Sequence, residues 1–490
     1  MNIAIRNLQP TSLWNHFSDL NAVPRPSKKE ERVIQFMVDF GKNLQLETKV
    51  DEVGNVIIKK PATQGFENRK TIVMQSHLDM VHQKNSDTLF DFDTQGIQML
   101  IDGDWVTADG TTLGADNGLG VAAIMAILSS NDISHPAIEA LFTIDEETGM
   151  TGAMGLKGGL LEGDILLNLD TEEDNEIDIG CAGGVDITAT LEYEEEDTPD
   201  NTFDLRIAIT GLQGGHSGMD IHKGLGNANK IMNRLLHYGA NHFGLRISEI
   251  DGGSLRNAIP RESFATVVID YNSLESFRSE MDLLIQLIQK ELGSLEPNLA
   301  IDISPCDTPS KVMPLDIQQL FIKAIYGALN GVYKMSADME DLVETSNNIA
   351  RVLVKDGHIK IGCLTRSSSD SSKLDLANSL KSVFELAGFD VEFSGLYPGW
   401  QPNVNSEILK VLTSLYEKLF HEKPNVVACH AGLECGILGQ IYPDMDMISF
   451  GPTIRGAHSP DEKVSISSVQ KFWKFLLAIL ENIPKKETSH

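Results

Sequence analysis

The alternation of apolar and polar positions near the start of the chain predicts strands that take turns with helices. Apolar runs at 71–81, 137–145 and 164–173 predict buried strands, and each run ends in polar or acidic residues. Residues 118–130, GLGVAAIMAILSS, have the length and the small side chains of a helix that packs closely. This order predicts an α/β domain, in which functional side chains collect at the carboxyl ends of the strands.

Two shorter patterns predict the elements that precede these strands. Ser27 and Glu30 are three residues apart and stand before the amphipathic stretch RVIQFMVDFGKNL. This is the pattern of a capping box at the start of a helix. Gly54-Asn55 lies between two alternating runs in VDEVGNVIIKK, which predicts a hairpin turn.

The middle of the chain has a different pattern. VDITATLEYEEE, TFDLRIAITGL and ATVVIDYNS alternate as half-exposed strands do, and helical stretches at 224–240 and 274–292 lie among them. A similar order of elements returns at 349–393. We therefore expect a mixed-sheet catalytic domain flanked by helices and an inserted α+β domain, the second of which has two related αβ halves. The predicted limits are 1–184 and 399–490 for the first domain and 185–398 for the insertion.

Composition narrows the classes of function and partner. The chain has 490 residues with 70 Asp+Glu and 40 Lys+Arg, which gives a formal charge of −30. This balance argues against nucleic acid and anionic membranes as partners. There is no apolar run of about 18 residues that would span a membrane, and the N-terminus lacks the pattern of a secretory signal. Five scattered cysteines without a CxxC pair fit reduced thiols, so we expect a cytoplasmic protein.

The stretch FTIDEETG places three acids, Asp145, Glu146 and Glu147, at the end of a predicted buried strand. A run of acids usually lies in a solvated loop, and a single histidine or Asp-Asn-Gly is usually structural. Four further ends of apolar segments also carry residues that can bind metal, which favours a shared site. The candidate ligands are His77, Asp116, Glu146 or Glu147, Asp170 and His458.

Two histidines and three carboxylates suit zinc, with manganese or cobalt as substitutes. One carboxylate can bridge two ions about 3.5–4 Å apart, as two-metal hydrolases require. Asp79 is two residues beyond His77 and points the same way in an extended segment, so it can accept the other ring N–H of that histidine. Two adjacent glutamates can divide the work: one binds metal and the other takes a proton.

Seven motifs in order along the chain resemble those of the M20 metallopeptidases. They are SHLDMV, GADNGLG, DEETGMTGA, NLDTEE, GHSGMDIH, GGSLRNAIP and GAHSPDE. The resemblance spans nearly the whole chain and implies a zinc-peptidase-like catalytic domain with two divalent ions, most readily Zn²⁺. The roles it implies are His77 and Asp170 on one ion, Glu147 and His458 on the other, Asp116 as the bridge, Glu146 as the general base and Asp79 as the partner of His77. It also implies a cis peptide between Asp116 and Asn117.

The same resemblance implies substrate residues in the inserted domain, which would be a lid. His216 in GGHSG corresponds to a histidine that binds the scissile carbonyl oxygen, although the motif alone also fits a glycine-rich turn. Asn257 corresponds to an asparagine that helps to hold substrate. Arg366 is at the position of an arginine that pairs with a substrate carboxylate, although an exposed arginine between serines is otherwise unremarkable.

The implied function is a dinuclear metal-dependent dipeptidase that cleaves Xaa-His and other dipeptides, carnosine-type substrates included, with metal-activated water. Two alternatives stay open: an N-acyl amino acid deacylase of the same family, and a non-catalytic peptide-binding relative. The implied partners are small dipeptides, with a homodimer left open. The length of the insertion favours a His216 that serves its own chain over one that serves a neighbour.

Overall fold

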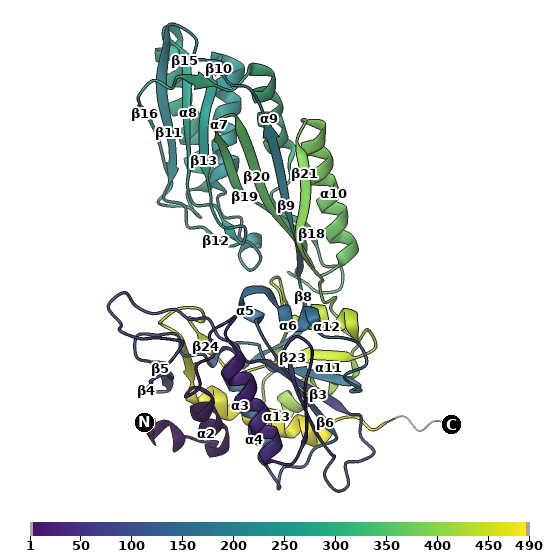
Figure 1. The fold of residues 1–490 in the computed structure, drawn as a ribbon. Coiled ribbons are helices and arrows are strands. Elements are labelled where there is room, and N and C mark those ends of the chain that lie inside the picture. The colour runs from purple at the N-terminus through teal and green to yellow at the C-terminus, as the bar shows by residue number, and fades with distance from the viewer. Residues whose placement is uncertain (1–2, 487–490) are drawn as a thin grey trace. The chain divides into compact units, whose positions relative to one another are not determined.

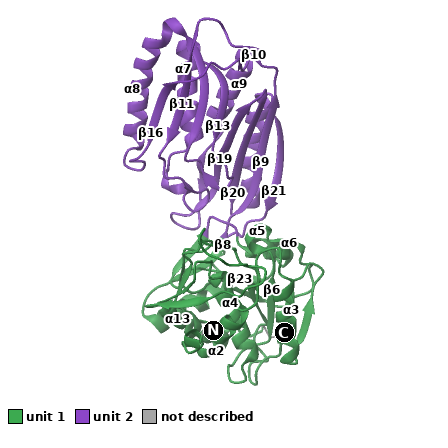
Figure 2. Ribbon diagram, turned by 60° about the vertical axis from the view of Figure 1, so that its left-hand side comes forward, with its two compact units in different colours: residues 1–180, 402–428, 433–490 green, residues 181–401, 429–432 purple. Residues whose placement is uncertain are grey.

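The computed structural model describes residues 3–486, which form two compact units. Of the described residues, 3–180, 402–428 and 433–486 form unit 1, and 181–401 and 429–432 form unit 2 (Figure 2). The sequence pattern had placed the insertion at 185–398 and had not included the short segment 429–432. Within residues 3–486, no helix is long and apolar enough to cross a membrane.

Unit 1 is built on an eight-stranded mixed sheet (Figure 1). The strands β3, β6, β7 and β23 pair in parallel at its centre, and the flanking pairs β1–β2, β2–β6 and β23–β8 are antiparallel. The order across the sheet is β1 (Glu47–Val50), β2 (Val56–Lys60), β6 (Ile138–Thr143), β3 (Ile72–His77), β7 (Ile165–Asn168), β23 (Asp446–Ser449), β8 (Glu176–Cys181) and β22 (Asn425–Cys429). The three predicted buried strands are thus confirmed as β3, β6 and β7, side by side.

Helices pack on this sheet through the apolar faces that the sequence predicts. Helix α4 (Ala115–Ser129) contacts β3 and α2 (Thr11–Leu20), and it is buried along almost its whole length, as its small apolar side chains require. Helix α11 (Glu407–Phe420) packs on α13 (Ile466–Asn482). A second, four-stranded sheet has the order β24 (Ile454–Arg455), β25 (Lys463–Ser465), β5 (Trp105–Ala108) and β4 (Met99–Asp102).

The predicted hairpin is confirmed, whereas the predicted capping box is wrong. Strands β1 and β2 pair antiparallel with Val50 opposite Val56, so the Gly54-Asn55 turn lies between them. Helix α3 (Glu31–Asn43) begins without a side-chain cap. The hydroxyl of Ser27 donates a 2.8 Å hydrogen bond to Asp79 instead, because that buried carboxylate is the stronger acceptor.

Unit 2 is an antiparallel sheet of nine strands with four long helices packed on one continuous apolar core. In β9 the residues Val185, Ile187 and Ala189 are fully buried and alternate with partly exposed ones, which is the period that the sequence pattern predicts. The sheet order is β16 (Ala300–Pro305), β11 (Thr202–Thr210), β15 (Ser263–Asp270), β13 (Arg246–Gly252), β19 (Val343–Lys355), β20 (His358–Ser367), β9 (Gly183–Glu192) and β21 (Asp390–Tyr397), with β18 (Gly331–Met335) beside β19.

The chain passes through this sheet as two halves with the same order of elements. One half is β11, α7 (Ala228–Phe243), β13, β15, α8 (Leu274–Leu292) and β16. The other is β9, α9 (Leu315–Gly327), β19, β20, α10 (Asp370–Leu386) and β21, with the first half inserted after its first strand. Within each half, numbered along the chain, the strands lie across the sheet in the order 4-1-3-2. The halves join where strand 2 of one, β13, pairs with strand 2 of the other, β19.

Candidate metal centre and substrate residues

The carboxyl ends of β3 and β7 and the start of α4 bring three candidate ligands together in unit 1. His77 is the last residue of β3, Asp170 follows β7, and Asp116 lies in the first turn of α4. The Nε2 atom of His77 is 3.1 Å from Oδ1 of Asp116 and 3.5 Å from Oδ1 of Asp170. One ligand atom from each of the three residues lies within 4.8 Å of the others, which is close enough to share one ion.

A second group of three ligands meets on the other oxygen of the same aspartate. Nε2 of His458 is 3.2 Å from Oδ2 of Asp116 and 2.9 Å from Oε2 of Glu147. Their ligand atoms also lie within 4.8 Å of one another. Asp116 is therefore the residue common to both groups, with one oxygen toward each histidine. The peptide bond between Asp116 and Asn117 is cis, in agreement with the expectation from the resemblance.

The electrostatics of these groups suit the binding of divalent cations. Burial raises the pKa of Glu147 and of Asp170, and negative neighbours add to the effect. The carboxylates of Asp116 and Glu147 raise the pKa of His458 to about 11. Oε1 of Glu147 is buried and has no hydrogen-bond partner among the described residues. An orphaned buried carboxylate oxygen in a set of N and O donors is what divalent ions such as Zn²⁺ would satisfy.

Asp79 connects the first ligand to the acidic run that follows β6. Its Oδ1 atom is 3.3 Å from Nδ1 of His77, on the side of the ring away from Asp116. The same carboxylate accepts hydrogen bonds from the backbone N–H groups of Glu146 and Glu147 at 3.0 and 3.3 Å. Asp79 thus orients the imidazole and also holds the short helix α5 (Glu146–Gly149) that carries both glutamates.

Asn117 is a site residue that the sequence interpretation missed. Its Nδ2 atom donates a 2.7 Å hydrogen bond to the carbonyl oxygen of Leu169 and a second, short one to Oδ1 of Asp170. The sequence interpretation treated Asn117 only as half of the cis peptide. Its position directly after Asp116 in GADNG was the available signal, but the partner that it holds is 53 residues further along the chain.

In unit 2 the hydrogen bonds of His216 determine which ring nitrogen carries its proton. The two-residue strand β12 (Gly215–His216) pairs with β14 (Ala258–Ile259), so His216 lies opposite Ala258, next to Asn257. Nδ1 of His216 accepts hydrogen bonds from the N–H groups of Gly218 and Met219 at 3.2 and 3.1 Å. Nε2 must therefore bear the proton in the neutral ring. Burial, aided by the positive charge of Arg366, lowers the pKa of His216 to about 4.

Arg366 is buried in unit 2, with 4% of its surface exposed, so the exposed position that its serine neighbours suggested is wrong. Its Nη1 donates to the hydroxyl of Tyr397 at 2.8 Å, and its Nε to Oγ of Ser217 at 3.3 Å. In the part of the chain that the structure describes, no carboxylate forms a hydrogen bond or an ion pair with it. Since Ser217 follows His216 directly, the structure places Arg366, His216 and Asn257 in one group.

His430 joins this group from the segment 429–432 and was not predicted as a site residue. Its Nε2 lies 2.8 Å from Oγ of Ser346 on β19. Burial and the positive charge of Arg366 lower its pKa to about 3. The histidine comes from a part of the chain that otherwise belongs to unit 1, and no sequence period signals such an excursion.

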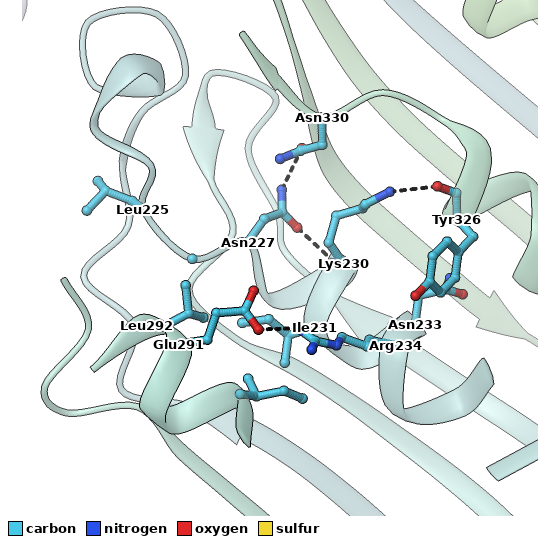
Figure 3. Close-up of a pocket in the computed structure, with 12 residues that line it drawn as sticks. Leu225, Asn227, Lys230, Ile231, Asn233, Arg234, Glu291, Leu292, Tyr326 and Asn330 are labelled. Atoms are coloured by element: carbon cyan, nitrogen blue, oxygen red, sulfur yellow. Dashed lines mark hydrogen bonds and ion pairs between the residues drawn. The ribbon is translucent and has the colours of Figure 1, made fainter. Parts of the chain in front are cut away.

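A cavity among the helices of unit 2 is a poorer candidate for the site. A cavity of about 280 Å³ lies between α7, α8 and α9 (Figure 3). Its charged groups already have partners: Lys230 donates to the carbonyl oxygens of Ile325, Tyr326 and Ala328, and Arg234 pairs with Glu291 at 2.8 Å. It holds no group of acids and histidines such as those in unit 1.

The comparisons with known proteins agree with this geometry. The model of the peptidase family M20/M25/M40 matches residues 73–482. The cytosol non-specific dipeptidase of Escherichia coli is 43% identical over 482 residues, which cover 98% of this chain and 99% of that protein.

Solved structures give the same result. The crystal structure of aminoacylhistidine dipeptidase from Vibrio alginolyticus matches with a TM-score of 0.92 and 46% identity, over 99% of both chains. Aminopeptidase PepT from Bacillus cereus shares the fold at a TM-score of 0.57 and 17% identity, over 97% of this chain and 99% of that one. The predicted fold class, a catalytic α/β domain with a lid, is thus confirmed. The chain belongs to the peptidase family M20/M25/M40 and is a hydrolase of the group that contains these two dipeptidases.

Proposed function

We propose that the protein is a dinuclear metal-dependent dipeptidase. The observation that carries this proposal is the carboxylate of Asp116, which presents one oxygen to the group of His77 and Asp170 and the other to the group of Glu147 and His458. Two ions held by these groups would be Zn²⁺, with Co²⁺ or Mn²⁺ as substitutes. When bound, they supply polarisation of the peptide carbonyl and a lowered pKa of the attacking water.

The proposed general base is Glu146. Burial raises its pKa well above the ordinary value, while His77 opposes the shift, so the environment favours holding a proton at this carboxyl group. A base that takes a proton from water and returns it to the leaving amine needs this property near neutral pH. Glu147 is its neighbour on α5 but has a different proposed task, because its Oε2 atom lies 2.9 Å from His458.

The proposed substrate residues of unit 2 act by donating hydrogen bonds. The Nε2–H of a neutral His216 is suited to stabilise an oxyanion, and a buried Arg366 is suited to bind the carboxylate of a dipeptide. Asn257 directly precedes β14, which pairs with the strand of His216, and it is proposed to hold the substrate backbone. The names of the two similar dipeptidases support dipeptides as substrates, with Xaa-His peptides, including carnosine-type ones, as the first class to test.

The two alternative functions predict different products. A deacylase of the same family would release an acid from N-acetyl-histidine, and a non-catalytic relative would release nothing. A base candidate beside a full set of possible ligands favours catalysis over binding alone. We also propose the cytoplasm as the location, after the cytosolic relative, and a homodimer as the assembly.

The test is the release of free histidine from an Ala-His dipeptide by the purified protein. We expect hydrolysis that stops when a chelator removes the metal and that returns, at least in part, with Zn²⁺, Co²⁺ or Mn²⁺. N-acetyl-histidine should be a poor substrate by comparison. Full activity in a sample shown to be free of metal would reject the metal-dependent mechanism, and faster hydrolysis of N-acetyl-histidine would favour the deacylase.

A further inference from the structure

The loop that carries Asp116 is held by a buried carboxylate outside the two ligand groups, that of Glu462. Glu462 accepts hydrogen bonds from four consecutive backbone N–H groups of this loop. The donors and distances are Leu113 (2.7 Å) and Gly114 (2.9 Å) to Oε2, and Ala115 (2.7 Å) and Asp116 (3.2 Å) to Oε1. The side chain is nearly inaccessible, with 2% of its surface exposed. Both oxygens are therefore used to fix the backbone on which Asp116 stands.

Arg25 holds the same loop through one of its carbonyl groups. Its Nη2 donates a 2.6 Å hydrogen bond to the carbonyl oxygen of Gly114, and its Nη1 donates to those of Leu78 and Asp79 at 3.0 Å each. Arg25 is 1% exposed. It thus joins the Asp116 loop to the segment directly after His77, so that one side chain ties together the supports of two candidate ligands.

The glycines of the GADNG motif make room for this guanidinium. A Cβ atom on Gly114 would lie 2.5 Å from Nη2 of Arg25, and one on Gly118 would lie 2.6 Å from the same atom. Gly114 also has a φ of +70°, which favours glycine. The spacing of these glycines therefore follows from the need to bury a charged group beneath the loop.

Burying two opposite charges is costly unless each is fully hydrogen-bonded, and a neutral packed core would be cheaper. In residues 3–486, Arg25 and Glu462 form no ion pair with each other. Their side chains hydrogen-bond to backbone groups and to Asn21, not to a ligand side chain. What these two buried charges do in the structure is to hold the backbone of the Asp116 loop, and this role accounts for the free-energy cost of burying them.

We propose that Arg25 and Glu462 are positioning residues that set the place of the Asp116 carboxylate between two metal ions. This inference rests on the proposed dinuclear function. Residues that orient metal ligands typically change metal affinity about 10–100-fold when they are replaced, and a small displacement of a bridging group has a large effect on rate.

The test uses Glu462→Gln, which removes the charge and turns an N–H₂ group toward backbone donors. We expect the second Mn²⁺ ion to bind about 10–100-fold more weakly than in the wild type. At saturating Mn²⁺, the exchange coupling between the two ions, seen by electron paramagnetic resonance, should change because the bridging carboxylate transmits it. The value of kcat should fall while KM changes little.

The matched control is Glu139→Gln in the same unit. Glu139 is also a buried carboxylate, and it accepts backbone N–H groups from Glu162 and Gly163 at 2.7 and 2.9 Å. Its loss should lower stability without changing Mn²⁺ affinity or coupling. If both variants behave alike in these two measurements, or if Glu462→Gln leaves both at the wild-type level, the positioning role is rejected.

Gly118→Ala provides an independent variant in case Glu462→Gln does not fold. It adds one methyl group against Nη2 of Arg25 and changes no charge. The same weakening of Mn²⁺ affinity and the same change in coupling are expected, and wild-type values would contradict the inference. If the wild-type protein itself shows no coupled pair of ions, the proposed dinuclear function fails, which is a different outcome from a normal pair in the variants.

Discussion

The groups of candidate residues in the two units are electrostatic opposites. In unit 1, burial among other acids raises the pKa of Glu147 and Asp170, and the acids raise the pKa of His458 to about 11. In unit 2, burial near Arg366 lowers the pKa of His216 to about 4 and that of His430 to about 3. The first group is rich in carboxylates, and the second is rich in hydrogen-bond donors.

This difference indicates what each group is built to receive. A cluster of buried carboxylates is stabilised by cations, whereas a buried arginine beside neutral histidines suits an anionic oxygen or a carboxylate. A peptidase that uses metal-activated water needs both: cations to activate the water, and donors for the oxyanion and the substrate terminus. Substitutions can test the acidic group of unit 1 and the donor group of unit 2 separately.

The largest effect is expected in the acidic group, from replacing the base. Glu146→Gln should lower kcat by about 10³-fold or more, because general-base catalysis is lost, while the protein keeps its metal. Glu147→Gln should instead lose part of its metal, because this side chain faces His458. Metal content by mass spectrometry and kcat are measured on both variants. Metal loss in Glu146→Gln with full metal in Glu147→Gln would mean that the two roles are reversed.

The contrast between these adjacent glutamates shows how much of the site the sequence predicts. The strand ends that carry His77 and Asp170 and the helix start that carries Asp116 follow from the apolar runs beside them, and the structure brings these three side chains together. Tertiary contacts between distant segments do not follow from such runs. The hydroxyl of Ser27 donates to Asp79, 52 residues away, instead of capping the helix. No local pattern in the sequence indicates that acceptor.

The fold shows the same division. Helix α8 spans Leu274–Leu292, as its local period predicts. The return of residues 429–432 to unit 2 depends on long-range packing. It brings His430 beside Ser346, a contact that no local period predicts.

In the lid group, His216→Ala should lower kcat by about 10²–10³-fold, as expected for the loss of one oxyanion donor. Metal content should not change, since the candidate ligands are all in unit 1. Mixing this variant with Glu146→Gln under conditions that exchange subunits tests whether the histidine serves its own chain. We expect the mixture to stay inactive. Recovery of a substantial fraction of wild-type activity would show that His216 serves a neighbouring chain.

A smaller effect is expected from Arg366→Ala, which should raise KM for dipeptides about 10–100-fold through loss of a charge-assisted contact. The matched comparison uses a dipeptide and its C-terminal amide, which lacks the carboxylate. The wild type should prefer the dipeptide, and the variant should treat the two substrates nearly alike. An unchanged preference in the variant would show that Arg366 does not bind this carboxylate.

The smallest effect concerns a buried acid of unit 1 outside the ligand groups, Asp178. Burial raises its pKa to about 7, and its Oδ2 accepts a 2.7 Å hydrogen bond from the hydroxyl of Thr171. The folded state holds the proton more tightly than the unfolded chain, whose aspartates ionise near pH 4. Stability is therefore unaffected below about pH 4, and it falls as pH rises from there to about 7.

Asp178→Asn keeps the shape and removes this titration, so its Tm relative to wild type should rise between pH 5 and pH 8, by several degrees at most. The exposed Asp109→Asn serves as the control and should show no such trend. A Tm difference for Asp178→Asn that stays constant over this range would mean that the carboxyl group is already ionised in the folded protein.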